Sequence, residues 1–361
     1  MFSNEILNNR LETVRTKLKE NNLDAVFITK RENYLYVSGF TGSSAFLLIT
    51  NDKAYILTDF RYVEQAAKQA PQFEIVEYKK SLVETIKELL ISEKIQKLGF
   101  EDENVSYATY SSYKKTWGNA ELIGIGSMVE SLRAIKDEEE IALINKAVEI
   151  ADAAFQHVVG IIKPGITELD VAAELEYKMR KLGAAGGSFD AIVASGLRSS
   201  MPHGIASDKR LELGDPITID FGAIYRNYCS DMTRTVFLGQ PSPEMLKIYN
   251  IVLKAQKESS AGAVAGLTGK QVDKIARDII YSSGYEGKFG HGLGHGVGLE
   301  VHEYPRLSFA AENLLMNNMA VTIEPGIYVE GLGGVRIEDI IIINDNKPIT
   351  LTKSSKDIII I

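Results

Sequence analysis

Residues 216–239 read PITIDFGAIYRNYCSDMTRTVFLG. Apolar and β-branched residues alternate on both sides of Tyr225 and Arg226, which predicts a β-hairpin with its turn centred there. In that register Asp220 and Asp231 lie opposite each other, and both side chains point to the same face of the hairpin. Two like charges directly opposed on a sheet destabilise it. The pair therefore requires a positive partner.

A second segment, AVTIEPGIYVEGLGGVRIEDIIII (320–343), has the same character. A glycine-rich loop centred at Gly331 would join two apolar strands and pair Glu324 with Glu338. A single acidic residue in a strand usually marks an edge or a turn. Two facing acidic pairs in two similar hairpins instead indicate a shared counter-charge, and bound metal is the simplest source of it.

The two hairpins belong to a longer internal repeat. Each half begins with two predicted helices, continues with a glycine-rich segment that holds histidine, and ends with one of the hairpins. The tripeptides GIT (165–167) and GLT (266–268) separate the helices of each pair. Two similar halves that face each other would place a site between them. The helices are predicted at 138–161 and 167–182, and at 243–263 and 270–283.

Three of the five histidines lie in HGLGHGVGLEVHE, residues 291–303. His295 is flanked by glycines, which allow close backbone approach and unusual dihedral angles around a bound ion. With the four carboxylates it makes five candidate ligands, too many for one four-coordinate zinc. The set suits two divalent ions that share a water. Oxygen ligands favour manganese, and one imidazole extends the range to cobalt, zinc or iron.

The first part of the chain differs from this repeat. The segments at 24–29, 45–50 and 54–59 have the composition of strands, and 81–94 has helical spacing of its apolar residues. A small α/β domain is therefore predicted at residues 1–130 and a second domain at 131–361. The length of 361 residues agrees with two cores rather than one.

The composition excludes several classes of protein. The formal net charge is −8, which argues against a surface for nucleic acid or for anionic membrane. Cys229 is the one cysteine, so no internal disulfide can form and a reducing compartment is expected. No apolar run approaches the ~20 residues of a membrane span. We expect a soluble, cytoplasmic protein.

The order Asp-x10-Asp, GHGVGLEVHE, IEPG and GVRIED resembles a known family, the proline-directed peptidases of the pita-bread fold. Prolidase and aminopeptidase P are its members. NYLYVSGFTGSSAFLLIT (33–50) with TDFRYVEQA (58–66) is similar to the creatinase-type leading domain of that family. The resemblance implies an α+β fold, with a pita-bread catalytic domain of two pseudo-symmetric halves behind an α/β amino-terminal domain.

The family pattern implies a role for each ligand. Asp220 would bind one metal ion, and Asp231 and Glu338 would bridge two. His295 and Glu324 would complete the second ion. Glu324, in TIEPG, would also act as the general base. All five ligands are present, which argues against creatinase activity.

Four further residues match positions around the family's substrate. His203 and His302 would contact the substrate carbonyl and the tetrahedral intermediate. His291 would line the proline pocket, and Arg336 would lie near the carboxyl side of the substrate. His203 and His291 could instead be structural loop residues, and Arg336 could be the ion-pair partner of an acidic residue.

The resemblance implies a proline-containing peptide as the substrate, two divalent ions, with manganese or cobalt implied, and a homodimer. Xaa-Pro aminopeptidase is the first functional hypothesis. An Xaa-Pro dipeptidase limited to dipeptides is the alternative, because a wall just past the proline leaves no signature in the motifs. An inactive peptide-binding protein of the same fold is a distant third, disfavoured by the intact ligand set.

Overall fold

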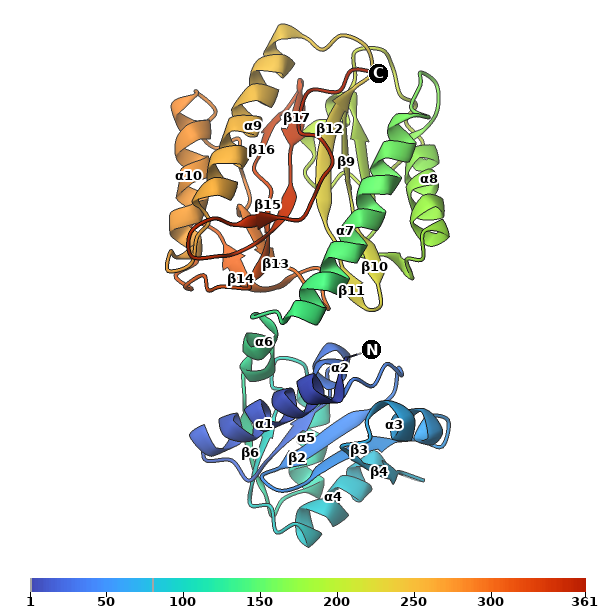
Figure 1. The fold of residues 1–361 in the computed structure, drawn as a ribbon, viewed down its shortest axis with the longest axis vertical. Coiled ribbons are helices and arrows are strands. Elements are labelled where there is room, and N and C mark those ends of the chain that lie inside the picture. Colours follow the sequence, from blue (N-terminus) through green and yellow to red (C-terminus); the bar gives the residue numbers. More distant parts are fainter. Residues whose placement is uncertain (1, 80) are drawn as a thin grey trace. The chain divides into compact units, whose positions relative to one another are not determined.

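The computed structural model describes residues 2–79 and 81–361 and divides them into two compact units (Figure 1). The first unit ends at Arg133, the last residue of helix α6, and the second runs from Ala134 to Ile361. No helix among the described residues combines the length and the apolar character that crossing a bilayer requires.

The first unit is built on a six-stranded sheet with strand order β4-β3-β2-β1-β5-β6. Strand β1 pairs antiparallel with β2 and parallel with β5. Phe27 of β1 meets Trp117 edge to face, with ring centroids 5.6 Å apart, within the apolar core. The predicted strands and helix are confirmed. The elements are α1 (Asn4–Glu20), β1 (Ala25–Ile28), α2 (Arg31–Ser38), β2 (Phe46–Thr50), β3 (Ala54–Thr58), α3 (Val63–Gln69), β4 (Glu74–Glu77), α4 (Leu82–Ser92), β5 (Lys97–Phe100), α5 (Tyr107–Thr116), β6 (Glu121–Gly124) and α6 (Met128–Arg133).

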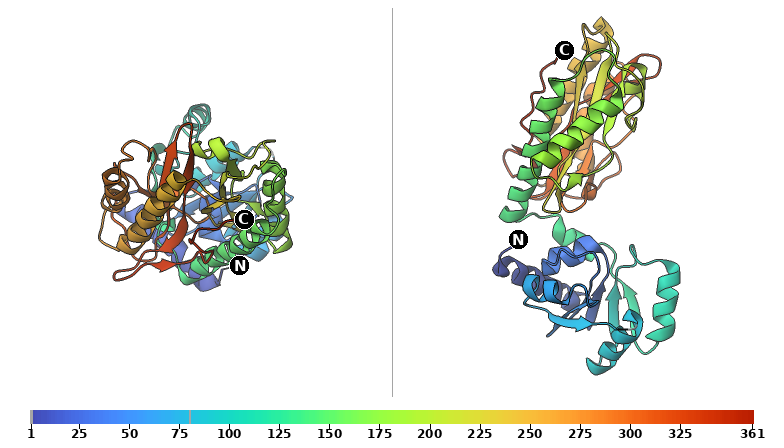
Figure 2. Two further views of the ribbon diagram at one scale, coloured as in Figure 1. Left: turned by 90° about the horizontal axis from the view of Figure 1, so that it is seen from above. Right: turned by 90° about the vertical axis from the view of Figure 1, so that its right-hand side faces the viewer.

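The first half of the second unit opens with the predicted helix pair. Asp137 caps α7 through a capping box with Glu140, and Thr167 of the GIT tripeptide caps α8 in the same way. Figure 2 shows both helices lying over the strands of this half. The elements are α7 (Glu138–Val159), α8 (Glu168–Lys181), β7 (Gly186–Gly187), β8 (Ile192–Ser195), the 3₁₀ helix η1 (Gly196–Ser200), β9 (Pro216–Phe221), β10 (Ala223–Tyr225), β11 (Tyr228–Cys229) and β12 (Met232–Phe237).

The second half repeats this order. Thr268 of the GLT tripeptide caps α10 through a capping box with Gln271, as Thr167 caps α8. Each half has its own apolar core between its helix pair and its strands. The elements are α9 (Pro243–Gly262), α10 (Gly269–Ser282), β13 (Gly294–Gly296), β14 (Glu303–Leu307), β15 (Ala320–Ile323), β16 (Gly326–Val329), β17 (Gly333–Arg336), β18 (Asp339–Ile342) and β19 (Ile349–Thr350).

The predicted pairing of the first hairpin is wrong by two residues. Arg226 and Asn227, with φ of 46° and 72°, occupy the turn, one position later than predicted. Asp220 therefore lies opposite Thr233 and not opposite Asp231. Two consecutive positive φ values give the type I′ turn that suits the twist of a two-residue hairpin. Because the shift is even, the alternation of the strands still leaves both carboxylates on one face.

The second hairpin has the predicted register. Ile323 pairs with Asp339 on one side, and Gly326 pairs with Arg336 on the other. Glu324 and Glu338 lie between these two ladders, where regular pairing is interrupted. The register on either side places the two glutamates across from each other, as the sequence predicts.

The two halves meet along their central strands. The backbone N–H of Glu338 donates to the carbonyl of Thr233 at 3.1 Å, and the N–H of Arg336 donates to Thr235 Oγ1 at 3.2 Å. Strand β12 of the first half thus runs beside β17 and β18 of the second. In Figure 1 the pairs α7–α8 and α9–α10 lie on either side of these strands. Side chains at the join can therefore come from both halves.

Candidate metal centre and active-site cavity

A cavity of about 520 Å³ lies at the join between the two halves of the second unit. Both halves contribute to its wall, so it lies where the internal repeat predicts a site. All nine residues singled out from the sequence line it: His203, Asp220, Asp231, His291, His295, His302, Glu324, Arg336 and Glu338.

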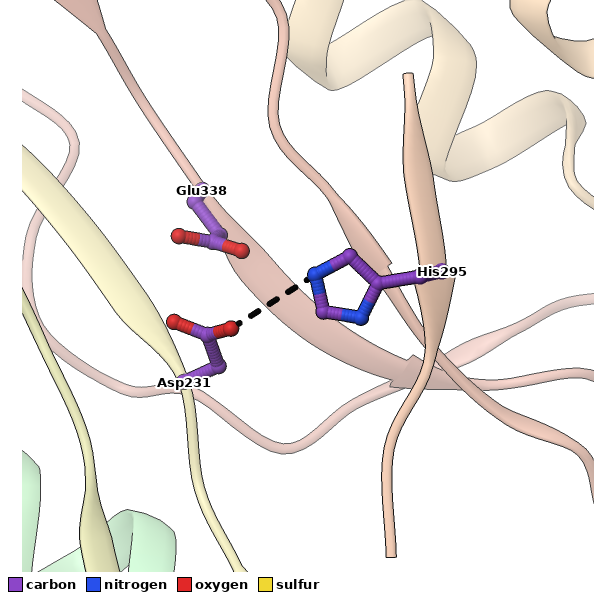
Figure 3. Close-up of side chains that lie close together, drawn as sticks. All are labelled: Asp231, His295 and Glu338. Carbon is purple, nitrogen blue, oxygen red and sulfur yellow. Dashed lines mark ion pairs between the residues drawn. The ribbon is translucent and has the colours of Figure 1, made fainter. Parts of the chain in front are cut away.

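Three of the expected metal ligands form a compact group at the base of this cavity. One ligand atom each from Asp231, His295 and Glu338 lies within 4.8 Å of the other two (Figure 3). The Nε2 atom of His295 is 3.7 Å from Asp231 Oδ2 and 3.4 Å from Glu324 Oε1. These separations exceed direct hydrogen bonds. The ligand atoms of these side chains therefore face one shared space between them.

The carboxylates of this group have strongly perturbed pKa values. Burial raises the pKa of Glu324 to about 8. Burial, followed by repulsion from the other carboxylates, also raises the pKa of Asp231 and of Glu338 well above the ordinary range. Three acidic groups this close together, Asp231, Glu324 and Glu338, are not all ionised at neutral pH unless a further cation lies among them. A divalent cation would supply the missing charge.

Two oxygen atoms show that this group fits a metal. Asp220 Oδ1 and Asp231 Oδ1 are buried, and neither finds a hydrogen-bond partner among the described residues. A buried carboxylate oxygen without a partner loses its hydration and gains nothing in return. Hard oxygen donors with one imidazole are a ligand set for Mn²⁺, Co²⁺, Zn²⁺ or Fe²⁺. The cavity thus holds a carboxylate–histidine group whose donor atoms fit a divalent metal.

His295 is held ready to act as a ligand. Its backbone N–H donates to Thr322 Oγ1 at 3.1 Å, and its Nδ1 lies 3.1 Å from the carbonyl of Gly296. That contact favours a proton on Nδ1, which leaves the lone pair on Nε2 facing the carboxylates. Burial lowers the pKa of His295 to about 3, so the ring is neutral. A Cβ at Gly294 would lie 2.0 Å from the carbonyl of Thr322, so only glycine fits beside His295.

Thr233 links the metal ligands to Arg336. Its Oγ1 donates to Glu338 Oε2 at 2.7 Å and accepts from Arg336 Nε at 3.0 Å. Sequence reasoning missed Thr233. Its spacing of two residues from Asp231 in one strand could have revealed it, because that spacing places both side chains on the same face.

Arg336 is buried and fully engaged with protein partners. Its Nη2 lies 2.5 Å from Asp220 Oδ2, and its Nη1 donates to the carbonyl of Pro202 and to Tyr328 Oη. This geometry matches the structural ion pair considered as the alternative for this residue. Tyr328 Oη also lies 2.9 Å from His291 Nε2, so it joins the arginine to the histidine. No sequence pattern pointed to Tyr328.

The three other histidines singled out from the sequence lie at the cavity wall. His302 packs edge to face on His295, with 4.3 Å between ring centroids, and its side chain is exposed. His203 is exposed on the loop after η1. Burial lowers the pKa of His291 to about 4, so its ring is neutral beside Arg336. Two of the three rings are thus open to a bound molecule.

Arg306 is a cationic wall residue that sequence reasoning missed. It lines the cavity, is exposed, and pairs with His295 across the β13–β14 ladder. Opposed residues of a ladder point to the same face, so its guanidinium points to the same side as the His295 ring. Nothing in the segment VHEYPRL distinguishes this arginine from a surface residue, because its role comes from the pairing of strands.

Comparisons with known proteins agree with this architecture. Residues 142–345 match the model of metallopeptidase family M24, and residues 10–135 match the creatinase/prolidase N-terminal domain. An Xaa-Pro dipeptidase of Pyrococcus horikoshii is 42% identical over 98% of this chain and 100% of its own length.

Two solved structures cover nearly the whole chain. An Xaa-Pro dipeptidase from Bacillus anthracis is 47% identical, with a TM-score of 0.97 over 98% of this chain and 100% of the other. An X-Pro aminopeptidase from Thermotoga maritima is 43% identical, with a TM-score of 0.90 over 96% of this chain and 100% of the other. The pita-bread fold and the leading domain expected from the motifs are confirmed. The chain belongs to metallopeptidase family M24 and carries a creatinase/prolidase N-terminal domain ahead of its peptidase domain.

Proposed function

We propose that this protein is an Xaa-Pro dipeptidase that uses two divalent metal ions, manganese first among the candidates. The relative from Pyrococcus horikoshii and the structure from Bacillus anthracis, both described as Xaa-Pro dipeptidases, support this choice. The sequence motifs alone put the aminopeptidase first, and the comparisons favour the dipeptidase instead. The Thermotoga maritima structure keeps the Xaa-Pro aminopeptidase as the second candidate.

The cavity supports the dipeptidase because it offers complementary charge at its wall. A dipeptide carries a free carboxylate just past the proline. Among the described lining residues, Arg306 and Arg336 carry guanidinium groups, and Arg336 is already paired with Asp220. We therefore assign Arg306, and not Arg336, to the substrate carboxylate. A charge-assisted bond to a carboxylate contributes about 1.5–3 kcal/mol.

Each ligand has a defined part in the proposed mechanism. Asp220, Asp231, His295, Glu324 and Glu338 would hold the two ions, with Asp231 and Glu338 shared between them. When bound, such a pair of ions acidifies a water molecule and polarises the scissile carbonyl.

The protein groups around the ions would move the protons and hold the substrate. Glu324 would accept a proton from the attacking water and return it to the proline nitrogen as that group leaves. His302 and His203, both exposed at the wall, would donate hydrogen bonds to the oxygen that gains charge in the transition state. His291 would line the pocket for the proline ring, held by its 2.9 Å contact with Tyr328 Oη.

The wider assignment follows the same reasoning. We assign catalysis to residues 131–361, and we assign residues 1–130 to the creatinase-type domain that precedes them. A proline-containing peptide, rather than nucleic acid or membrane, would be the partner, and the single Cys229 and net charge of −8 suit a cytoplasmic enzyme. A homodimer is expected from the resemblance to the family.

Peptide cleavage followed by mass spectrometry tests the proposal. Metal-stripped protein should be inactive. Added Mn²⁺ should restore cleavage of an Xaa-Pro dipeptide while an Xaa-Pro-Xaa tripeptide stays intact. Release of the first residue from the tripeptide would make the protein an aminopeptidase. If metal binds and neither peptide is cleaved, both enzyme assignments are wrong.

The role of Arg306 gives a second prediction. Arg306→Met keeps the length of the side chain and removes its charge, so the KM for the dipeptide should rise about 10- to 100-fold. The same dipeptide with an amide in place of its carboxylate provides the control, and its KM should hardly change. Equal effects on the two substrates would exclude a contact with the carboxylate.

A further inference from the structure

The loop that carries His203 closes around one buried carboxylate. Glu168, the first residue of α8, is 0% exposed. Its Oε1 accepts from both the backbone N–H and the Oγ of Ser195, each at 2.8 Å. Its Oε2 accepts from the N–H of Ser207 at 3.0 Å and from its Oγ at 2.7 Å. Both ends of the loop at residues 195–207 are thus fixed to the same side chain.

Arg198 extends this contact across the loop. Its Nη1 pairs with Glu168 Oε2, and its Nη2 donates to the carbonyl of Ile205 at 2.8 Å. The N–H of Ile205 in turn donates to the carbonyl of His203 at 2.9 Å. A chain of polar contacts therefore runs from the Glu168 carboxylate to the backbone of His203, which lines the cavity.

The loop has little apolar anchoring of its own. Its large apolar side chains, Leu197, Met201 and Ile205, are 62%, 54% and 57% exposed. Hydrogen bonds also join the loop to the second half: Gly334 N–H donates to Ser199 Oγ, and Arg336 donates to the carbonyl of Pro202. A segment with so little apolar burial depends on such bonds to keep one conformation.

The second half repeats this device. Asp273 of α10 is 1% exposed, pairs with Arg277, and accepts from the N–H of Leu293 at 3.0 Å. Arg277 donates to the carbonyl of His291 at 2.5 Å. In each half, then, the second helix supplies a buried carboxylate that pairs with an arginine. That arginine donates a hydrogen bond to the backbone of the segment that carries His203 or His291. The recurrence in both halves favours a shared role near the cavity.

We propose that Glu168 is a positioning residue that sets, through Arg198 and residues 195–207, the place of His203 in the cavity. The expected effect on kcat rests on the proposed peptidase function, whereas the expected effect on the position of His203 does not. Glu168 contacts no substrate in this scheme. If the role of Glu168 were purely structural, its substitution would lower the stability of the protein without a specific effect through His203.

A double-mutant cycle separates the two roles. In the manganese-loaded protein, Glu168→Gln should lower kcat for the dipeptide about 10-fold or more, because the neutral amide cannot hold all the donors. In a His203→Ala background the same substitution should cause no further loss. Equal losses in both backgrounds would overturn the proposal. Glu176→Gln, in an exposed ion pair with Arg180 on the same helix, is the matched control and should leave kcat unchanged.

A second readout does not depend on activity. The protein has five histidines, so nuclear magnetic resonance of isotope-labelled histidine in the zinc-loaded protein can follow each ring at fixed pH. Glu168→Gln should shift or broaden the His203 signal and leave that of His157, which pairs with Glu174, in place. An unchanged His203 signal would contradict the proposal even if the wild-type protein cleaves no peptide. If Glu168→Gln does not fold, Arg198→Met tests the same link and should give the same two results.

Discussion

Glu338→Gln should empty the metal site and abolish peptide cleavage. The Glu338 side chain is 1% exposed and accepts a hydrogen bond from Thr233. One of its carboxylate oxygens lies within 4.8 Å of a ligand atom of Asp231 and of one of His295. A neutral amide keeps the shape and the Thr233 contact but removes a charge that would be shared by two ions. The loss of activity should exceed the roughly 10- to 100-fold that is lost when a residue hydrogen-bonded to a metal ligand is removed.

The stability of the metal-free variant distinguishes metal loss from misfolding. The pKa of Glu338 is raised in the folded protein by burial and by its acidic neighbours. A carboxyl group with a raised folded pKa stabilises the fold at low pH, and this contribution is lost as the pH rises through the folded pKa. Near neutral pH, removal of this charge should therefore leave the Tm of the metal-free protein unchanged or higher.

Metal content by elemental analysis and Tm by calorimetry provide the measurements for Glu338→Gln. Glu312→Gln, which breaks an exposed ion pair with Lys270 in the same unit, should retain full metal and full activity. Wild-type metal content in Glu338→Gln would exclude Glu338 as a shared ligand.

Glu324→Gln should stop the chemistry in a different way. Here the expected loss is in kcat, by about 10²- to 10⁴-fold, because a general base contributes that much to proton transfer. Glu324 lies directly after β15 with its Oε1 3.4 Å from His295 Nε2, and burial raises its pKa to about 8 in the metal-free protein. A carboxylate beside the other ligand atoms can exchange protons with a water molecule held among them.

The measurement for Glu324→Gln is kcat at saturating Mn²⁺, with metal content determined on the same sample. Saturation matters because Glu324 is also expected to be a ligand, and a loss that disappears at high Mn²⁺ would reflect weaker binding alone. A kcat close to that of the wild type at full occupancy would place the general base elsewhere.

The sequence predicted the parts of this structure that depend on local pattern. The capped helices, the second hairpin and the five candidate ligands follow from apolar spacing, turn residues and the repeated motifs. The other cavity residues, His203, His291, His302 and Arg336, were implied by the resemblance to the family. The prediction for the first hairpin was wrong at one point. Asn227 is a plausible turn residue in the sequence, but the strand alternation centred the turn at Tyr225 and Arg226, whereas Arg226 and Asn227 form it. A turn displaced by one residue moves the partner of Asp220 by two, to Thr233.

The residues that sequence reasoning missed acquire their roles from contacts distant in the chain. Tyr328 matters because its hydroxyl reaches both Arg336 and His291. Arg306 matters because β14 pairs with β13 and brings it opposite His295. Glu168 looked like an ordinary first-turn residue of a helix, and only the folded loop at 195–207 shows what its carboxylate binds. Contacts between residues distant in the chain, unlike the periodic spacing of apolar residues, cannot be recognised in a single sequence.

The join of the two halves has a consequence for how the protein folds. Asp231 and Glu338 come from different halves, so their ligand atoms meet only after both cores have formed and β12 has docked beside β18. A ligand that binds only the native state stabilises it by about 2.7 kcal/mol at 100 times its Kd. That free energy would favour the association of the two halves, because each half supplies only part of the ligand set. Metal uptake would therefore be a late event in folding, and bound ions would stabilise an interface that has already formed.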